Sequence, residues 1–176
     1  MRVLTAMAAA FLALTPGIAA AAEPVCLTPA EFSSLAGYSL PSVISATTQR
    51  CAPTLGPGAF LSSKGKGLAS RYAATKGANW PKAKAAFLKL SNKGNQDMNQ
   101  IFGTMPDQSL QQVLDAMMEG MVAQQIPLER CGTIDDVVRL LSPLPPENTA
   151  ELIAIAVGLG SMAKSGRIGS ISLCPS

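Results

Sequence analysis

Four cysteines place the strongest constraint on the fold of this chain, because disulfides between them would tie distant segments together. They are Cys26, Cys51, Cys131 and Cys174, the only cysteines among 176 residues. No two of them have the Cys-x-x-Cys spacing of redox motifs or zinc knuckles. An even number of cysteines in an exported protein typically forms disulfides. We therefore expect two disulfides, for which four cysteines allow three pairings.

A repeated pattern around two of the cysteines favours one of these pairings. The segments 26–35 and 131–140 each contain a cysteine, a threonine two residues later, an acidic residue three further on, an apolar residue and then a leucine. Helix starts have this pattern in many helical proteins, so it does not require a duplication. If each half of the chain is closed on itself, the disulfides are Cys26–Cys51 and Cys131–Cys174. This is the pairing that we predict.

The first 22 residues predict export. Arg2 supplies a positive charge, an apolar stretch follows over 3–14, and Ala20–Ala22 provides the small residues that signal peptidase requires. The apolar stretch is shorter than the roughly 20 residues that span a bilayer. We predict removal of residues 1–22, a periplasmic or secreted location, and no transmembrane segment in the mature chain. The mature chain, 23–176, has the length of one domain.

Apolar residues recur at helical spacing along the mature chain, which predicts an all-α fold: a compact bundle of about seven short-to-medium helices held by two disulfides. The clearest pattern, over 107–125, consists of Leu110, Val113, Leu114, Met117 and Met121. The other predicted helices cover about 28–37, 41–51, 59–76, 79–94, 133–141 and 148–164, with a short segment around 98–102. The helix at 148–164 is apolar nearly all round, which is typical of a helix at the centre of a core.

Charge is distributed unevenly between the two halves of the predicted domain. The front half, 23–96, has nine bases and two acids, whereas the back half, 97–176, has four bases and nine acids. The simplest interpretation is that the two halves neutralise each other or face water. Within the front half, the segment 64–93 contains eight basic residues and no acid.

A second interpretation of the basic segment is a contact with an anionic surface. Aromatic residues lie among the lysines, and helices of this kind are typical of proteins that bind anionic lipid headgroups. Export argues against nucleic acid as the ligand. The predicted contact residues are Lys64, Lys66, Arg71, Lys76, Trp80, Lys82, Lys84, Lys89 and Lys93.

The composition excludes several kinds of active site. The chain contains no histidine, so a triad with an imidazole base and a histidine-ligated zinc site are both ruled out. Five methionines occur between Met98 and Met121, and thioethers can bind Cu(I). We instead attribute Met117 and Met121 to core packing, because they share the apolar stripe of the helix at 107–125. We predict no metal or other cofactor.

Two pairs of acidic residues are the candidates for catalysis. Asp115 and Glu119 lie one turn apart on the same predicted helix, and Asp135 and Asp136 are adjacent. A glycosidase-type hydrolase needs two acids that face each other across a cleft. Neither pair meets that requirement, so we assign no catalytic residue and favour a role without catalysis.

Together these features predict an exported, soluble helical protein that binds a partner, either another protein or an envelope lipid. One alternative is a module that binds lipid or an anionic envelope surface through the basic segment 64–93. A second alternative is a hydrolase with an acid or serine mechanism that no motif in the chain identifies.

Overall fold

The computed structural model describes residues 26–92, 96–163, 167–168 and 171–174. Within them the chain is all-α, a bundle of seven α-helices with two disulfides, as the sequence predicts. The predicted leader, 1–22, and Lys93 lie outside the described residues. The helices are α1 (Pro29–Cys51), α2 (Phe60–Ala73), α3 (Lys76–Ser91), α4 (Gln96–Thr104), α5 (Asp107–Gln125), α6 (Cys131–Leu141) and α7 (Pro146–Ala163).

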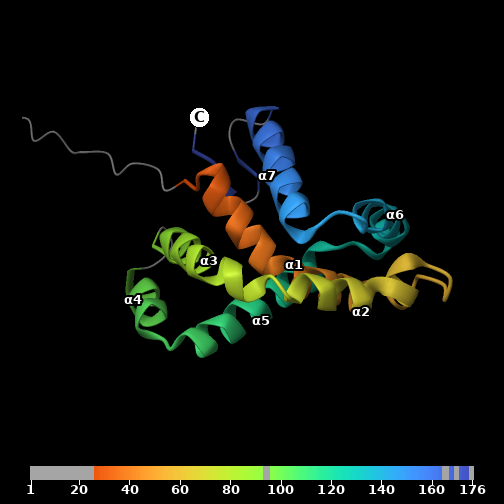
Figure 1. Cartoon of the computed structure of the whole chain (residues 1–176), viewed down its shortest axis with the longest axis horizontal. Coiled ribbons are helices and arrows are strands. Elements are labelled where there is room, and N and C mark those ends of the chain that lie inside the picture. Colours follow the sequence, from red (N-terminus) through yellow and green to blue (C-terminus); the bar gives the residue numbers. More distant parts are fainter. Residues whose placement is uncertain (1–25, 93–95, 164–166, 169–170, 175–176) are drawn as a thin grey trace, which may run out of the picture.

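Helix α1 is the central helix of the bundle and packs against α2, α3, α5 and α7 (Figure 1). Its first turn has a capping box, in which the Thr28 hydroxyl accepts from the Glu31 backbone N–H and the Glu31 carboxylate accepts from the Thr28 backbone N–H. Helix α1 runs without a break from Pro29 to Cys51, so the prediction of two separate helices over 28–37 and 41–51 is wrong. Pro41 lies inside it and is buried, and an internal proline bends a helix rather than always ending it.

Two glycines mark close contacts between helices. A Cβ atom added to Gly37 of α1 would lie 3.0 Å from the Asn79 side chain of α3 and 3.5 Å from Ala150 of α7. A Cβ atom added to Gly65 of α2 would collide with the Thr48 side chain of α1. These glycines therefore allow three helices to approach α1 closely.

Helix α7 is not at the centre of the core, so that prediction is wrong. Its small residues Ala150 and Ala154 are buried, whereas Leu152, Ile155 and Leu159 are exposed. The reason is that small side chains permit the closer approach to α1, and the large side chains then point away from it.

Helix α5 has the predicted bounds, 107–125, but its buried face differs from the predicted one. Leu110, Leu114 and Val122 are buried, whereas Met117 and Met121 are about half exposed, at 45% and 51%. The assignment of these two methionines to the core is therefore wrong. The packed stripe advances by four residues at a time, and Met117 and Met121 lie beside it.

The disulfide pairing also differs from the predicted one. Cys26 joins Cys174 and Cys51 joins Cys131, so the predicted pairs Cys26–Cys51 and Cys131–Cys174 are wrong. Because the 23 residues of α1 form one helix, about 35 Å long, Cys26 and Cys51 lie at opposite ends of it. A disulfide needs Cα atoms within about 7 Å, and the observed pairs have Cα distances of 4.9 and 5.5 Å.

The Cys26–Cys174 disulfide holds the end of the chain against the start of α1. After α7, strands β1 (Arg167–Ile168) and β2 (Ile171–Ser172) form a short antiparallel ladder. The following residue, Leu173, pairs with Leu27, and the Leu27 carbonyl accepts a hydrogen bond of 2.9 Å from the Cys174 backbone. Leu27 is completely buried by this arrangement.

We expect Gly65→Ala to be less stable than the matched variant Gly67→Ala. Both replacements improve the helix propensity of α2 by up to about 1 kcal/mol. At Gly65 the new methyl group collides with Thr48, whereas nothing lies within 4 Å of the same atom at Gly67. Overpacking costs about 1–3 kcal/mol, and chemical denaturation of both variants measures this difference. Equal unfolding midpoints would contradict the close approach of α1 and α2.

Candidate functional site

Three lysines of the basic segment 64–93 form ion pairs within the molecule. Lys76 contacts Asp115 at 2.5 Å, Lys84 contacts Asp107 at 2.6 Å, and a third pair joins Lys89 and Glu31 at 2.9 Å. The first two pairs connect the basic front half to the acidic back half of the chain. The uneven charge along the sequence is thus partly balanced where the two halves meet.

Two of these lysines lower the pKa of the carboxyl groups with which they pair. The hydrogen bond from Lys89, assisted by the Thr28 backbone, lowers the pKa of Glu31 below its ordinary value. Lys84, and to a smaller extent the nearby Trp80 indole, lowers the pKa of exposed Asp107. A lowered carboxyl pKa favours the folded state at neutral pH, and that contribution is lost as the pH falls through the lowered value.

The other predicted contact residues are not all available to a ligand. Trp80 is buried against Tyr38, with 5.1 Å between ring centroids. Arg71 is exposed but donates to the Ser142 carbonyl in the loop after α6. Among the described residues of the basic segment, Lys64, Lys66 and Lys82 are exposed without a hydrogen bond or ion pair.

A polar junction joins α1, α3 and α5 around the candidate acid Asp115. Its carboxylate accepts from the Ser42 hydroxyl at 2.9 Å and from the Lys76 ammonium with both oxygens. Lys76 also lies 4.6 Å from the centroid of the Tyr38 ring. The tyrosine is almost fully buried, and burial, with a smaller effect from Asp115, raises its pKa.

This junction has the features of a structural contact rather than a catalytic one. The Lys76 ammonium donates to both oxygens of Asp115 and has no lone pair, so it cannot act as a base that accepts the proton of the Ser42 hydroxyl. The other acid of the pair, Glu119, is exposed on α5. We therefore find no observation that favours the hydrolase interpretation of Asp115 and Glu119.

The candidate acid Asp135 caps a helix that is distant in sequence. Its carboxylate, on α6, accepts from the backbone N–H groups of Phe60 at 3.1 Å and Leu61 at 2.6 Å, in the first turn of α2. The residue before α2, Ala59, has no side chain that could do this. Asp135 therefore satisfies two donors that would otherwise lack a partner, next to the Cys51–Cys131 disulfide that ties α6 to α1.

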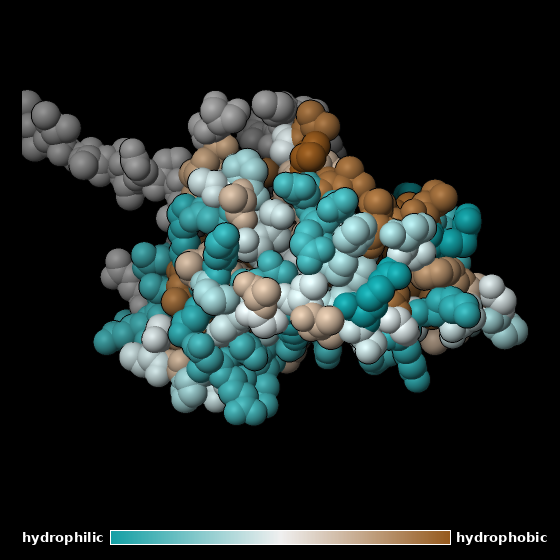
Figure 2. Space-filling model, in the orientation of Figure 1, coloured by the Kyte–Doolittle hydropathy of each residue, from teal (hydrophilic) through white to brown (hydrophobic). Residues whose placement is uncertain are grey.

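The most unusual surface of the molecule is apolar and lies on α6 and α7. Figure 2 shows apolar residues along α7 and again over α6 on the same side of the molecule. Both helices pack their inner faces against one cluster of buried side chains, through Val138 of α6 and Ile153 of α7. The exposed residues, which we call the α6–α7 apolar surface, are Val137 at 49%, Leu140 at 67%, Leu152 at 42%, Ile155 at 57% and Leu159 at 64%.

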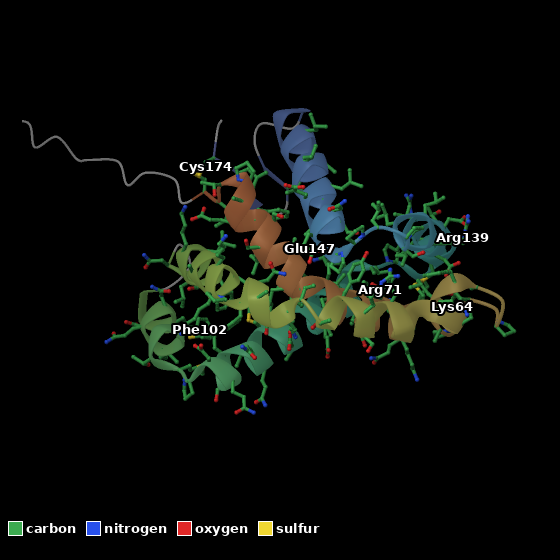
Figure 3. All side chains as sticks on the ribbon, in the orientation of Figure 1. Lys64, Arg71, Phe102, Arg139, Glu147 and Cys174 are labelled. Carbon is green, nitrogen blue, oxygen red and sulfur yellow. A yellow bond between two sulfur atoms is a disulfide. The ribbon has the colours of Figure 1, made fainter. Side chains whose placement is uncertain are left out.

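The border of this surface is charged. Glu147 and Glu151 are exposed in the first turns of α7 and form no ion pair among the described residues. On α6, Arg139 pairs with Asp136 at 3.1 Å. Figure 3 shows Arg139 on α6 and Lys64 on α2 at the same end of the molecule.

This surface was not predicted from the sequence, because the apolar residues all round α7 favoured a helix at the centre of the core. The sizes of the residues along α7 indicate which face is packed. Ala150 and Ala154, four residues apart, mark the packed face, whereas the large residues on the opposite face have a spacing of three and four. Small residues at helical spacing are typical of a close helix contact.

Comparisons with models of known protein families, with curated protein sequences and with solved structures give no match. Among the described residues, no helix is long and apolar enough to cross a membrane. Nor do three or more acidic or cysteine side chains in that part of the chain form a group suited to a metal ion.

We expect Asp135→Ala to destabilise the protein far more than Asp136→Ala. The first change leaves the Phe60 and Leu61 donors without a partner, at a cost of about 1–3 kcal/mol. The second removes an exposed ion pair with Arg139, which is worth under about 1 kcal/mol. Thermal and chemical unfolding of the two variants gives the comparison. Similar losses for both would show that Asp135 does not cap α2.

Proposed function

We propose that this chain is an exported binding protein that acts without catalysis and binds its partner through the α6–α7 apolar surface. The observation that carries the proposal is the exposure of five large apolar side chains on these two helices. Export is supported by the two disulfides, which are typical of oxidising compartments, and by the predicted leader. The periplasm or the exterior of the cell is the corresponding location.

Energetics favour a binding role for this surface. Exposed apolar area costs about 25 cal/mol per Å² relative to buried area, and large contiguous apolar patches with polar borders mark interaction sites. Polar residues at these five positions would not disturb the core, because none of the five side chains belongs to the buried clusters. Covering these side chains therefore supplies free energy for association.

Site-specific photo-crosslinking in the native host tests the proposal. A photoreactive side chain at Leu140 or Leu159 should give covalent adducts, because a bound partner covers these positions. The matched control is Met121, which is equally apolar and half exposed but lies on α5. Adducts at Met121 alone, or at none of the three positions, would contradict a binding role for the α6–α7 apolar surface.

A second candidate function is binding to an anionic envelope surface through the basic segment. The exposed, unpaired lysines Lys64, Lys66 and Lys82 favour it. Such side chains attract anionic headgroups, by about 1 kcal/mol for each residue close to the membrane. This proposal does not need Trp80 or the three lysines that form ion pairs.

We expect glutamine at Lys64, Lys66 and Lys82 together to abolish binding to phosphatidylglycerol vesicles at low salt, if this second function is correct. Cosedimentation measures the bound fraction, and glutamine at Arg130 and Arg139 provides a control for loss of charge elsewhere. Exposed charges act most strongly at low ionic strength. If the unaltered protein does not sediment with the vesicles under those conditions, the electrostatic form of this function is wrong.

A further inference from the structure

We propose that the Cys26–Cys174 disulfide is a site of reversible thiol–disulfide exchange, and that its reaction partner is a dithiol protein of the oxidoreductase class. The Cys51–Cys131 disulfide, in contrast, is structural. This role goes beyond the proposed function, because the α6–α7 apolar surface takes no part in it. The two disulfides differ in two respects that bear on exchange, namely their access to a reagent in solution and the contacts that each one holds together.

Only one of the two disulfides is accessible from solution. Cys51 and Cys131, which join the end of α1 to the start of α6, are 0% and 1% exposed. Cys26 and Cys174 are both partly exposed. Exchange begins when a thiolate attacks a disulfide sulfur, so its rate depends on access to that sulfur. A reductant can therefore reach Cys26–Cys174 in the folded protein, whereas α1 and α6 must first separate before it reaches Cys51–Cys131.

The position of the Cys26–Cys174 disulfide allows it to open without disturbing a helix. Cys26 precedes the capping box of α1, and Cys174 follows β2, so neither cysteine belongs to a helix. Figure 3 shows Cys174 beside the start of α1 and away from α6. The packing of α1 against α2, α3, α5 and α7 does not involve either residue. Reduction at this site therefore leaves the helical bundle and the Cys51–Cys131 disulfide in place.

The disulfide holds a short segment over an apolar side chain. The Cys174 N–H donates to the Leu27 carbonyl at 2.9 Å, and Leu173 pairs with Leu27 in a single bridge. Leu173 also packs against the buried cluster that contains Leu27 and lies close to Gly158 of α7. Strands β1 and β2 have two residues each, and a two-stranded ladder is only marginally stable by itself. Once the disulfide is reduced, this segment can leave and uncover Leu27, which is otherwise completely buried.

The exchange transfers two electrons from the dithiol to the protein disulfide. A thiolate of the dithiol attacks one sulfur of the Cys26–Cys174 bond, which breaks, and a mixed disulfide forms. The other cysteine leaves as a thiolate and takes up a proton from water. The second thiol of the partner loses its proton and displaces the remaining cysteine, which is protonated in turn. The protein then has two thiols and the partner one disulfide, and the reverse sequence restores the starting state.

Timed reduction of the purified oxidised protein, in the form that its host exports, tests the exchange. The probe is thioredoxin, kept reduced by its reductase and NADPH, and new thiols are alkylated with N-ethylmaleimide and located by peptide mass spectrometry. Cys26 and Cys174 should be labelled together, and at least about tenfold faster than Cys51 and Cys131, because the buried pair requires opening of the fold. Equal rates for both pairs, or faster labelling of Cys51 and Cys131, would overturn the proposal. So would a Cys26–Cys174 disulfide that dithiothreitol reduces and thioredoxin does not.

Hydrogen–deuterium exchange tests the release of the segment. In protein reduced only at Cys26–Cys174, peptides over 167–174 should exchange at least about tenfold faster, while peptides from α2 and α6 stay unchanged. The variant Cys26→Ser with Cys174→Ser should behave in the same way. The matched variant Cys51→Ser with Cys131→Ser should exchange faster in α6 and keep 167–174 protected. A segment that stays protected after reduction, or a reduced protein that loses protection in every helix, would overturn the proposal.

Discussion

The middle of α1 is enclosed by four other helices, and this enclosure depends on small side chains. Gly37 and Ala46 are buried there, as are Ser39 and Ser42, and large neighbours such as Tyr38 and Ile44 fill the remaining space. Gly65 of α2 and Ala150 of α7 provide the matching small residues on the surrounding helices. Because α1 occupies the centre, each of these four helices has one face on α1 and another face that water or a partner must cover. The exposed stripe of α7 is a direct consequence.

The charge pattern has a similar origin. Like charges would repel one another within the basic front half and within the acidic back half. The ion pairs Lys76–Asp115 and Lys84–Asp107 join the two halves across the bundle. The exposed Lys84–Asp107 pair contributes little free energy by itself. Asp115 has a larger structural role, since its carboxylate also holds the buried Ser42 hydroxyl of α1. Lys64, Lys66 and Lys82, which have no hydrogen bond or ion pair within the described part of the chain, then remain as basic residues that an anionic ligand could contact.

The position of α6 depends on contacts between residues that are far apart in sequence. The Cys51–Cys131 disulfide, with a sequence separation of 80, fixes the start of α6 at the end of α1. Asp135, one turn later, caps α2. The loop after α6 is held by α2 as well, because Tyr72 donates to the Leu144 carbonyl and contacts the Thr149 hydroxyl. These contacts orient α6 and α7 so that their apolar residues are exposed on one side, which is the basis of the proposed binding function.

The sequence by itself determined the all-α class, the bounds of α5, the capping box of α1 and the formation of two disulfides. Each of these features follows from local spacing or from the number of cysteines, and none of them requires knowledge of contacts between distant residues. Only the tertiary structure decided which cysteines pair, which helix is central and which apolar residues are exposed. Cys26 and Cys51 cannot pair because α1 continues through Pro41 and keeps them at its opposite ends, and a local pattern does not show whether a helix continues through a proline or ends there. Likewise, the pattern of α7 shows apolar residues on both faces, and the face that is buried was set by the fit of Ala150 and Ala154 against α1.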